Sequence, residues 1–173
     1  MRVLLLFLDG VGIGPDDAEI NPFLRARMPV LEGLLGGLPV AGGLRPGTSE
    51  APAPSRFTGR VLPLDATLDV TGTPQSGTGQ AALLTGESTA EMYGAHFGPW
   101  TPVRLRPLVE EGSILRQARD GGRSVAFANA YPRGWPGPRG GRRIAGPPLA
   151  ARGAGVLDRH EEALGAGNAV SSE

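Results

Sequence analysis

The chain has 173 residues, 40% of them hydrophobic, and a formal net charge of zero. A chain of this length can bury a single core, and zero net charge gives no general attraction to nucleic acid or to an anionic membrane. Cysteine is absent and all 17 basic residues are arginine, which excludes thiolate metal sites, cysteine nucleophiles and lysine-based chemistry.

The chain opens with a continuous apolar run at residues 3–8, which is typical of a central parallel strand covered on both faces. The run ends in Asp9 and a glycine-rich turn, not at a small-residue cleavage site, and it is far shorter than the ~20 residues of a membrane span. We therefore expect a buried strand in a cytoplasmic protein. Apolar residues at helical spacing predict a short helix over 29–35, and a loop-like composition follows over 39–55.

The middle of the chain alternates between strand-like and helix-like segments. A short second strand is expected at 61–64, a helix over 79–85, a longer helix over 107–119 and a strand over 124–128. Strand, helix and strand in succession favour an α/β fold with a mainly parallel sheet flanked by helices.

The amino-acid composition changes in the last part of the chain. Residues 132–155 are dense in Pro, Gly and Arg, and only a short helix over 157–164 is expected after them. No closing strand follows, so the sequence predicts a fold truncated at its C-terminus. We divide the chain into an α/β segment, 1–131, and an excursion with a short helix, 132–173, which would begin a cap region.

Asp9 is the first candidate site residue, because α/β folds bind ligands at the C-terminal ends of their strands. Its carboxylate would suit a hard divalent cation, but an aspartate here can also cap the following turn with its own oxygens. The glycine-rich turn does not match the dinucleotide-binding motif G-x-G-x-x-G, because Pro15 stands where the third glycine is required.

Thr78 is the second candidate, within the motif QSGTGQ at residues 75–80. A hydroxyl at a helix start can have its alkoxide stabilised by free N–H groups and the positive end of the helix dipole. The alternative is a helix cap, which needs no catalysis. The motif is not a phosphate-binding loop of the Gly-Lys-Ser/Thr type, because the chain has no lysine.

Together the two sites resemble the alkaline phosphatase superfamily. The strand end FLDGVGIG at 7–14 and the later QSGTGQ and LLTG segments carry the likeness. Within that superfamily they are similar to the branch of cofactor-independent phosphoglycerate mutase, phosphopentomutase and related metalloenzymes. The segments NPF at 21–23, GAHFGPW at 94–100 and NAYP at 129–132 also look like this branch, so the likeness covers most of residues 1–132.

The resemblance implies phosphatase or phosphomutase chemistry on a small phosphorylated metabolite. Asp9 would be a metal ligand, and Thr78 both a metal ligand and the phosphoryl acceptor. Two divalent ions, Mn or Zn, would clamp the phosphate, giving a phosphothreonine intermediate. Arg104 and Arg106 are candidates for holding phosphate oxygens, and His96 for a substrate-side position.

The chain departs from the family pattern in its metal ligands. The family completes its two-metal site with aspartates and histidines from a C-terminal segment, whereas this chain has only His96 and His160. Asp158 and His160 are two residues apart, and such residues do not share a helix face. We therefore expect one bound metal or none in this chain, which would then be inactive alone. The alternative is a non-catalytic remnant or binding module that keeps the fold without a complete metal site.

Overall fold

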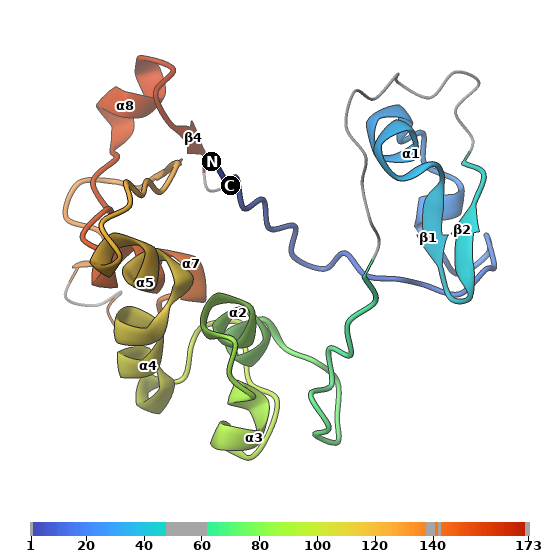
Figure 1. Cartoon of the computed structure of the whole chain (residues 1–173), viewed down its shortest axis with the longest axis horizontal. Helices are drawn as coiled ribbons and strands as arrows, with labels where there is room; N and C mark the ends of the chain where they lie inside the picture. Colours follow the sequence, from blue (N-terminus) through green and yellow to red (C-terminus); the bar gives the residue numbers. More distant parts are fainter. Residues whose placement is uncertain (1, 48–61, 138–140, 142, 172–173) are drawn as a thin grey trace. The chain divides into compact units, whose positions relative to one another are not determined.

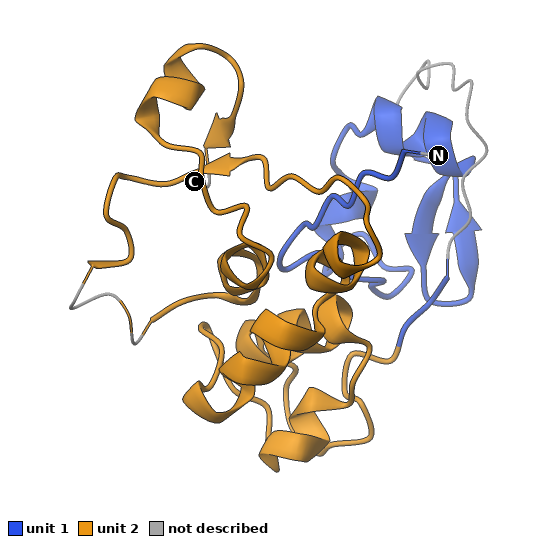
Figure 2. Cartoon of the chain, turned by 60° about the vertical axis from the view of Figure 1, so that its left-hand side comes forward, with its two compact units in different colours: residues 1–64 blue, residues 65–173 orange. Residues whose placement is uncertain are grey.

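The structure is a computed structural model that describes residues 2–47, 62–137, 141 and 143–171. These residues fall into two compact units, Met1–Leu64 and Asp65–Glu173, coloured separately in Figure 2. Both helices and strands are present, so a mixed α/β composition is confirmed. Within the described ranges the strands form two sheets of two strands each.

The first unit contains one α-helix whose limits follow from local sequence. Helix α1, Pro29–Leu35, has proline in its first turn and ends at Gly36, which adopts a left-handed conformation with φ of 78°. Proline fits the first turn because its missing N–H has no partner there, and glycine takes a positive φ without steric cost. The helix predicted over 29–35 is confirmed.

A β-hairpin follows α1 where the sequence predicts a loop. Strands β1, Leu38–Val40, and β2, Gly43–Arg45, pair antiparallel, with Leu38 opposite Arg45. Gly42 and Gly43 both have positive φ, which permits the tight reversal between the strands. The loop prediction is therefore wrong for residues 39–45, and residues 48–55 of that loop lie outside the described ranges.

Residues 3–8 are extended and exposed, not a buried strand. Leu4 is 86% exposed and Leu6 75% exposed, and no strand is formed at these positions. A strand requires a neighbour to take its backbone N–H and C=O groups, and none does so here among the described residues. The prediction of a buried strand is wrong for this structure. Residues 62–64 likewise form no strand, and Val61 lies outside the described ranges.

The second unit is mainly helical (Figure 1). Its helices are α2 Ser76–Thr85, α3 Thr89–Tyr93, η2 Val103–Leu105, α4 Arg106–Gly112, α5 Ile114–Asp120, α7 Gly146–Gly153 and α8 Glu161–Gly165; a short 3-10 helix of the first unit, η1, spans Pro22–Leu24. Helices α2, α4, α5 and α7 pack against one another. Their core consists of Ala81, Leu84, Val109, Ile144, Leu149 and Ala150, with Leu115 and Trp135 packed against it.

The helix predicted over 107–119 is two helices separated by Ser113. This residue has extended backbone angles, with φ of −66° and ψ of 152°, and its side chain accepts a hydrogen bond from the Arg116 N–H. Serine is a strong N-cap because its hydroxyl satisfies an otherwise free N–H of the first turn. The buried Ser113 therefore ends α4 and starts α5.

Helix α7 lies inside the Pro/Gly/Arg-rich segment and was not predicted from the sequence. Gly153 at its end lies directly on α4, since a Cβ there would be 2.0 Å from the carbonyl oxygen of Glu110. Leu149 and Ala150 of α7 are fully buried in the core. Residues 146–153 thus pack with helices between residues 76 and 120 and belong to the same compact unit.

The second sheet is a short parallel pair. Strand β3, Asn129–Ala130, pairs with β4, Val170–Ser171, and the Val170 N–H donates to the Ala128 carbonyl at 2.9 Å. The predicted strand at 124–128 is therefore displaced toward the C-terminus. The helix predicted over 157–164 is found as α8, beginning at Glu161.

No helix in the described part of the chain has the length and apolar character needed to cross a membrane.

Candidate functional site at the start of helix α2

The QSGTGQ motif forms the first turns of α2. The helix begins at Ser76, with the exposed Gln75 in extended conformation before it. A helix is confirmed here, but it starts three residues earlier than predicted. Thr78 therefore lies within the first turn and not ahead of it.

Thr78 is fully buried and its polar groups are engaged by neighbouring residues. Its N–H donates to the Phe97 carbonyl at 3.0 Å, and its hydroxyl accepts from the Phe97 N–H at 3.3 Å. The same hydroxyl donates to the Gln75 carbonyl at 3.3 Å, and the Thr89 hydroxyl donates to the Thr78 carbonyl at 2.6 Å. In this arrangement Thr78 joins the helix start to the segment that follows α3.

Residues 97–101 cover the head of α2 closely. A Cβ on Gly77 would lie 2.2 Å from the Trp100 carbonyl oxygen and 2.6 Å from that of Phe97. A Cβ on Gly98 would lie 3.2 Å from the Ser76 nitrogen. A side chain at Gly77 would require the backbone to shift, and Gly98 leaves little room for one.

Ser76 is a second hydroxyl residue at the start of α2, and it was not among the residues predicted from the sequence. It occupies the first position of α2 and is half-buried, whereas Thr78 is completely enclosed. Both residues lie in the first turn, near the positive end of the helix dipole. An earlier helix start would have identified it, since Ser76 and Gly77 are weak helix formers typical of a first turn.

His96 precedes Phe97, and its side chain contacts the backbone of the segment that leads into α2. Its Nε2 is 3.0 Å from the Val70 carbonyl oxygen, and Gly72 lies against the ring. The structure thus brings His96 and Thr78 into one region, joined through Phe97.

The two candidate arginines both contact backbone carbonyls. The Arg104 guanidinium donates to the Met92 carbonyl and lies over the Tyr93 ring, 4.6 Å from its centroid. Arg106 donates to the carbonyls of Thr101 and Gly141. Burial lowers the pKa of Arg106, the positive charge of Arg152 adds to this, and Glu110 opposes it. These contacts hold segments of the chain together.

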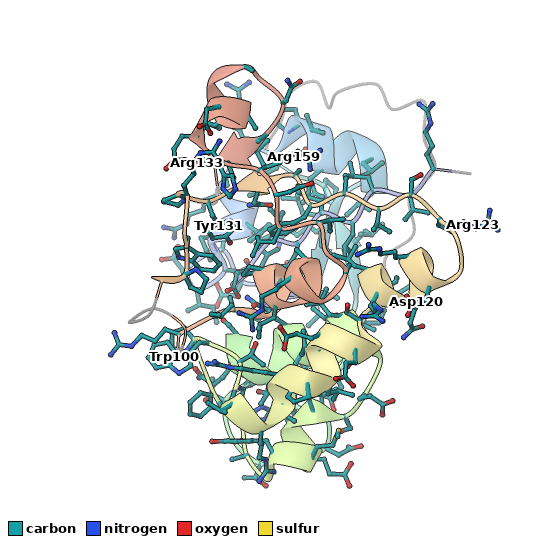
Figure 3. The ribbon with its side chains drawn as sticks, turned by 90° about the vertical axis from the view of Figure 1, so that its left-hand side faces the viewer. Trp100, Asp120, Arg123, Tyr131, Arg133 and Arg159 are labelled. Carbon is teal, nitrogen blue, oxygen red and sulfur yellow. The ribbon has the colours of Figure 1, made fainter. Side chains whose placement is uncertain are left out.

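Another arginine cluster lies around Tyr131 (Figure 3). The Tyr131 N–H donates to the Arg159 carbonyl at 3.1 Å, and Arg133 pairs with Glu162 at 2.8 Å. The Tyr131 ring stacks on Trp135 with centroids 4.1 Å apart. These groups are thus engaged by neighbouring residues of the protein.

Asp9 belongs to the first unit, whereas Thr78 belongs to the second. Asp9 is exposed, and its Oδ1 accepts from the Gly10 N–H at 2.9 Å, while Gly10 has a φ of 72°. Asp9 thus caps the following turn, which is the alternative to metal binding that the sequence left open. This arrangement neither supplies nor excludes a role in binding a metal.

The side chains of the described residues do not fit a two-metal centre. No group of three or more histidine, aspartate or glutamate side chains that could hold a metal occurs among them. Nδ1 of His160 is 2.9 Å from the Tyr131 carbonyl oxygen, which engages that ring within the protein.

No protein-family model, curated protein or solved structure matches the chain.

Proposed function

We propose that the chain is the nucleophile-bearing part of a phosphoryl-transfer enzyme of the phosphatase or phosphomutase type. The proposal rests mainly on the QSGTGQ motif, which forms the start of a ten-residue helix with two hydroxyl residues in its first turn. The positive end of the helix dipole favours a phosphate or an alkoxide at such a position. The substrate would be a small phosphorylated metabolite, and neither nucleic acid nor a membrane would be a partner.

The covalent step uses one of the two hydroxyls of that turn. Its oxygen forms a new bond to phosphorus and releases its proton to solvent, while the bond from phosphorus to the substrate oxygen breaks and that oxygen takes a proton from solvent. Water or a second hydroxyl then accepts the phosphoryl group. Thr78 is the acceptor predicted from the sequence, but Phe97 would have to move to expose it. Ser76, which is half-buried, is the other hydroxyl residue of this turn.

The parent site would also use Mn or Zn, with Asp9 among the ligands. Because the described side chains supply no complete donor set, the proposal assigns this chain only the hydroxyl and the helix terminus. The family likeness also implies a mainly parallel sheet, and the N-terminal sequence favours a cytoplasmic location. Of the two described strand pairs, β3–β4 is parallel and β1–β2 is antiparallel.

A non-catalytic binding module is the second candidate. It is favoured by the enclosed Thr78 hydroxyl and by the lack of a metal-holding group among the described residues. In that case the hydrogen bonds at the head of α2 serve only to hold the fold.

The test combines metal content by mass spectrometry with turnover of p-nitrophenyl phosphate in added Mn or Zn. Intact-mass measurement after exposure to substrate would detect a phosphorylated chain. Ser76→Ala and Thr78→Ala identify the acceptor, and Ser124→Ala, at an exposed serine outside the helices, is the matched control. Phosphorylation or turnover lost in one α2 variant and kept in the control supports catalysis. A chain that binds p-nitrophenyl phosphate without either reaction supports the binding module.

A further inference from the structure

His96 and Phe97, which are consecutive, contact both the segment before α2 and the first turn of α2. His96 contacts the Val70 carbonyl, in the segment that leads into the helix. Phe97 exchanges two hydrogen bonds with Thr78 in the first turn. One short stretch of chain therefore fixes both sides of the turn that contains Ser76.

The His96 contact indicates which ring nitrogen carries the hydrogen when the ring is neutral. A carbonyl oxygen only accepts hydrogen bonds, so Nε2 of His96 must carry the hydrogen. His160 presents the opposite case, because its Nδ1 faces the carbonyl oxygen of Tyr131. The two histidines of the chain are thus expected to be opposite neutral tautomers.

We propose that His96 is a positioning residue and not a substrate-binding one. Its Nε2–H holds residues 70–75 against the segment after α3, and so orients the first turn of α2 for phosphoryl acceptance. The catalytic part of this inference rests on the proposed function. The positional part rests on the Val70 and Thr78 contacts alone.

The first test is nitrogen-15 NMR of the two rings, recorded at alkaline pH so that both are neutral. The expected spectrum shows the Nε2–H form for His96 and the Nδ1–H form for His160, assigned with single His→Gln variants. An Nδ1–H form for His96 would overturn the proposal, because Nε2 could not then donate to Val70.

The second test compares His96→Ala, His96→Gln and the matched control His160→Ala by amide hydrogen exchange. The amides of Val70, Thr78 and Phe97 are all hydrogen-bonded and report on the site. Loss of the His96 bond should speed their exchange roughly threefold to tenfold in His96→Ala. Gln should restore most of the protection, because its amide nitrogen can donate from a similar reach. Unchanged amides in α4 and α7 would show that the variants remain folded.

The same variants separate the positional inference from the proposed function. If the chain has phosphoryl-transfer activity, His96→Ala should lower kcat with little change in KM, and Gln should recover most of it. A raised KM with unchanged kcat and unchanged exchange would indicate substrate binding and overturn the proposal. If the wild-type chain has no activity, the proposed function fails, while the exchange data still decide whether His96 positions the turn.

Discussion

Thr78 and Phe97 bind each other through two hydrogen bonds, although they are 19 residues apart in the chain. The Thr78 N–H donates to the Phe97 carbonyl at 3.0 Å, and the Phe97 N–H donates to the Thr78 hydroxyl at 3.3 Å. One helix N–H that would otherwise be free is satisfied in this way. The hydroxyl proposed for chemistry is consequently also part of the fold.

The first prediction contrasts two fully buried threonines, Thr78 and Thr101. Thr78→Val removes a hydroxyl that has protein partners and leaves the half-buried Phe97 N–H without its acceptor, so it should destabilise the chain by about 1–3 kcal/mol. Within the described residues the Thr101 hydroxyl has no hydrogen-bond partner. Thr101→Val should therefore be neutral or stabilising. Urea denaturation measures both, and equal losses of stability would contradict the assignment.

The second prediction concerns two glycines of α2. A Cβ on Gly77 would meet the Trp100 backbone at 2.2 Å, while a Cβ on Gly79 would meet nothing within 4 Å. Gly77→Ala should cost about 2 kcal/mol or more because a backbone atom must shift. Gly79→Ala should stabilise by about 0.5–1 kcal/mol because alanine is the better helix former. Thermal unfolding should rank the variants Gly79→Ala, wild type, Gly77→Ala, and the reverse order would refute the close packing.

The third prediction tests the contact between α4 and α7. Gly153→Ala would place a methyl group 2.0 Å from the Glu110 carbonyl oxygen, which forces the helices apart. A loss of about 2–3 kcal/mol is expected. The control is Gly112→Ala, at the last residue of α4, where a Cβ meets only the Leu108 side chain at 3.5 Å. Similar stabilities of the two variants in urea would show that α7 does not lie on α4.

The fourth prediction is a pH effect at Asp65. The Thr67 hydroxyl and then the Thr67 N–H hold the pKa of this carboxyl below its usual range, against a small opposing effect of burial. A carboxyl with a lowered pKa in the folded state contributes stability above its unfolded pKa, and this is lost as the pH falls through the folded pKa. Thr67→Val should raise the pKa of Asp65, and Thr67→Ser should retain the lowered value. NMR titration measures the pKa of Asp65 in each variant. Equal pKa values in Thr67→Val and Thr67→Ser would exclude the Thr67 hydroxyl as the cause.

Features encoded by neighbouring residues were predictable from the sequence. Helix α1 was found with its predicted limits, because Pro29 and Gly36 set its ends by their own backbone preferences. The helix of the QSGTGQ motif was also found, although its start was misplaced by three residues. Splitting of the helix over 107–119 was missed, even though Ser113 is a strong N-cap residue.

Features that depend on distant segments were not predictable in the same way. Helix α7 forms within a Gly/Pro-rich sequence because packing of Leu149 and Gly153 on other helices compensates for a weak intrinsic preference. The apolar composition of residues 3–8 predicted burial, but a strand is set by its partners and not by its own sequence. The hydroxyl of Thr78 was recognised from the sequence alone. Its enclosure was decided by the tertiary structure, because the backbone of Phe97 comes from a segment that reaches α2 only after α3 has turned the chain back.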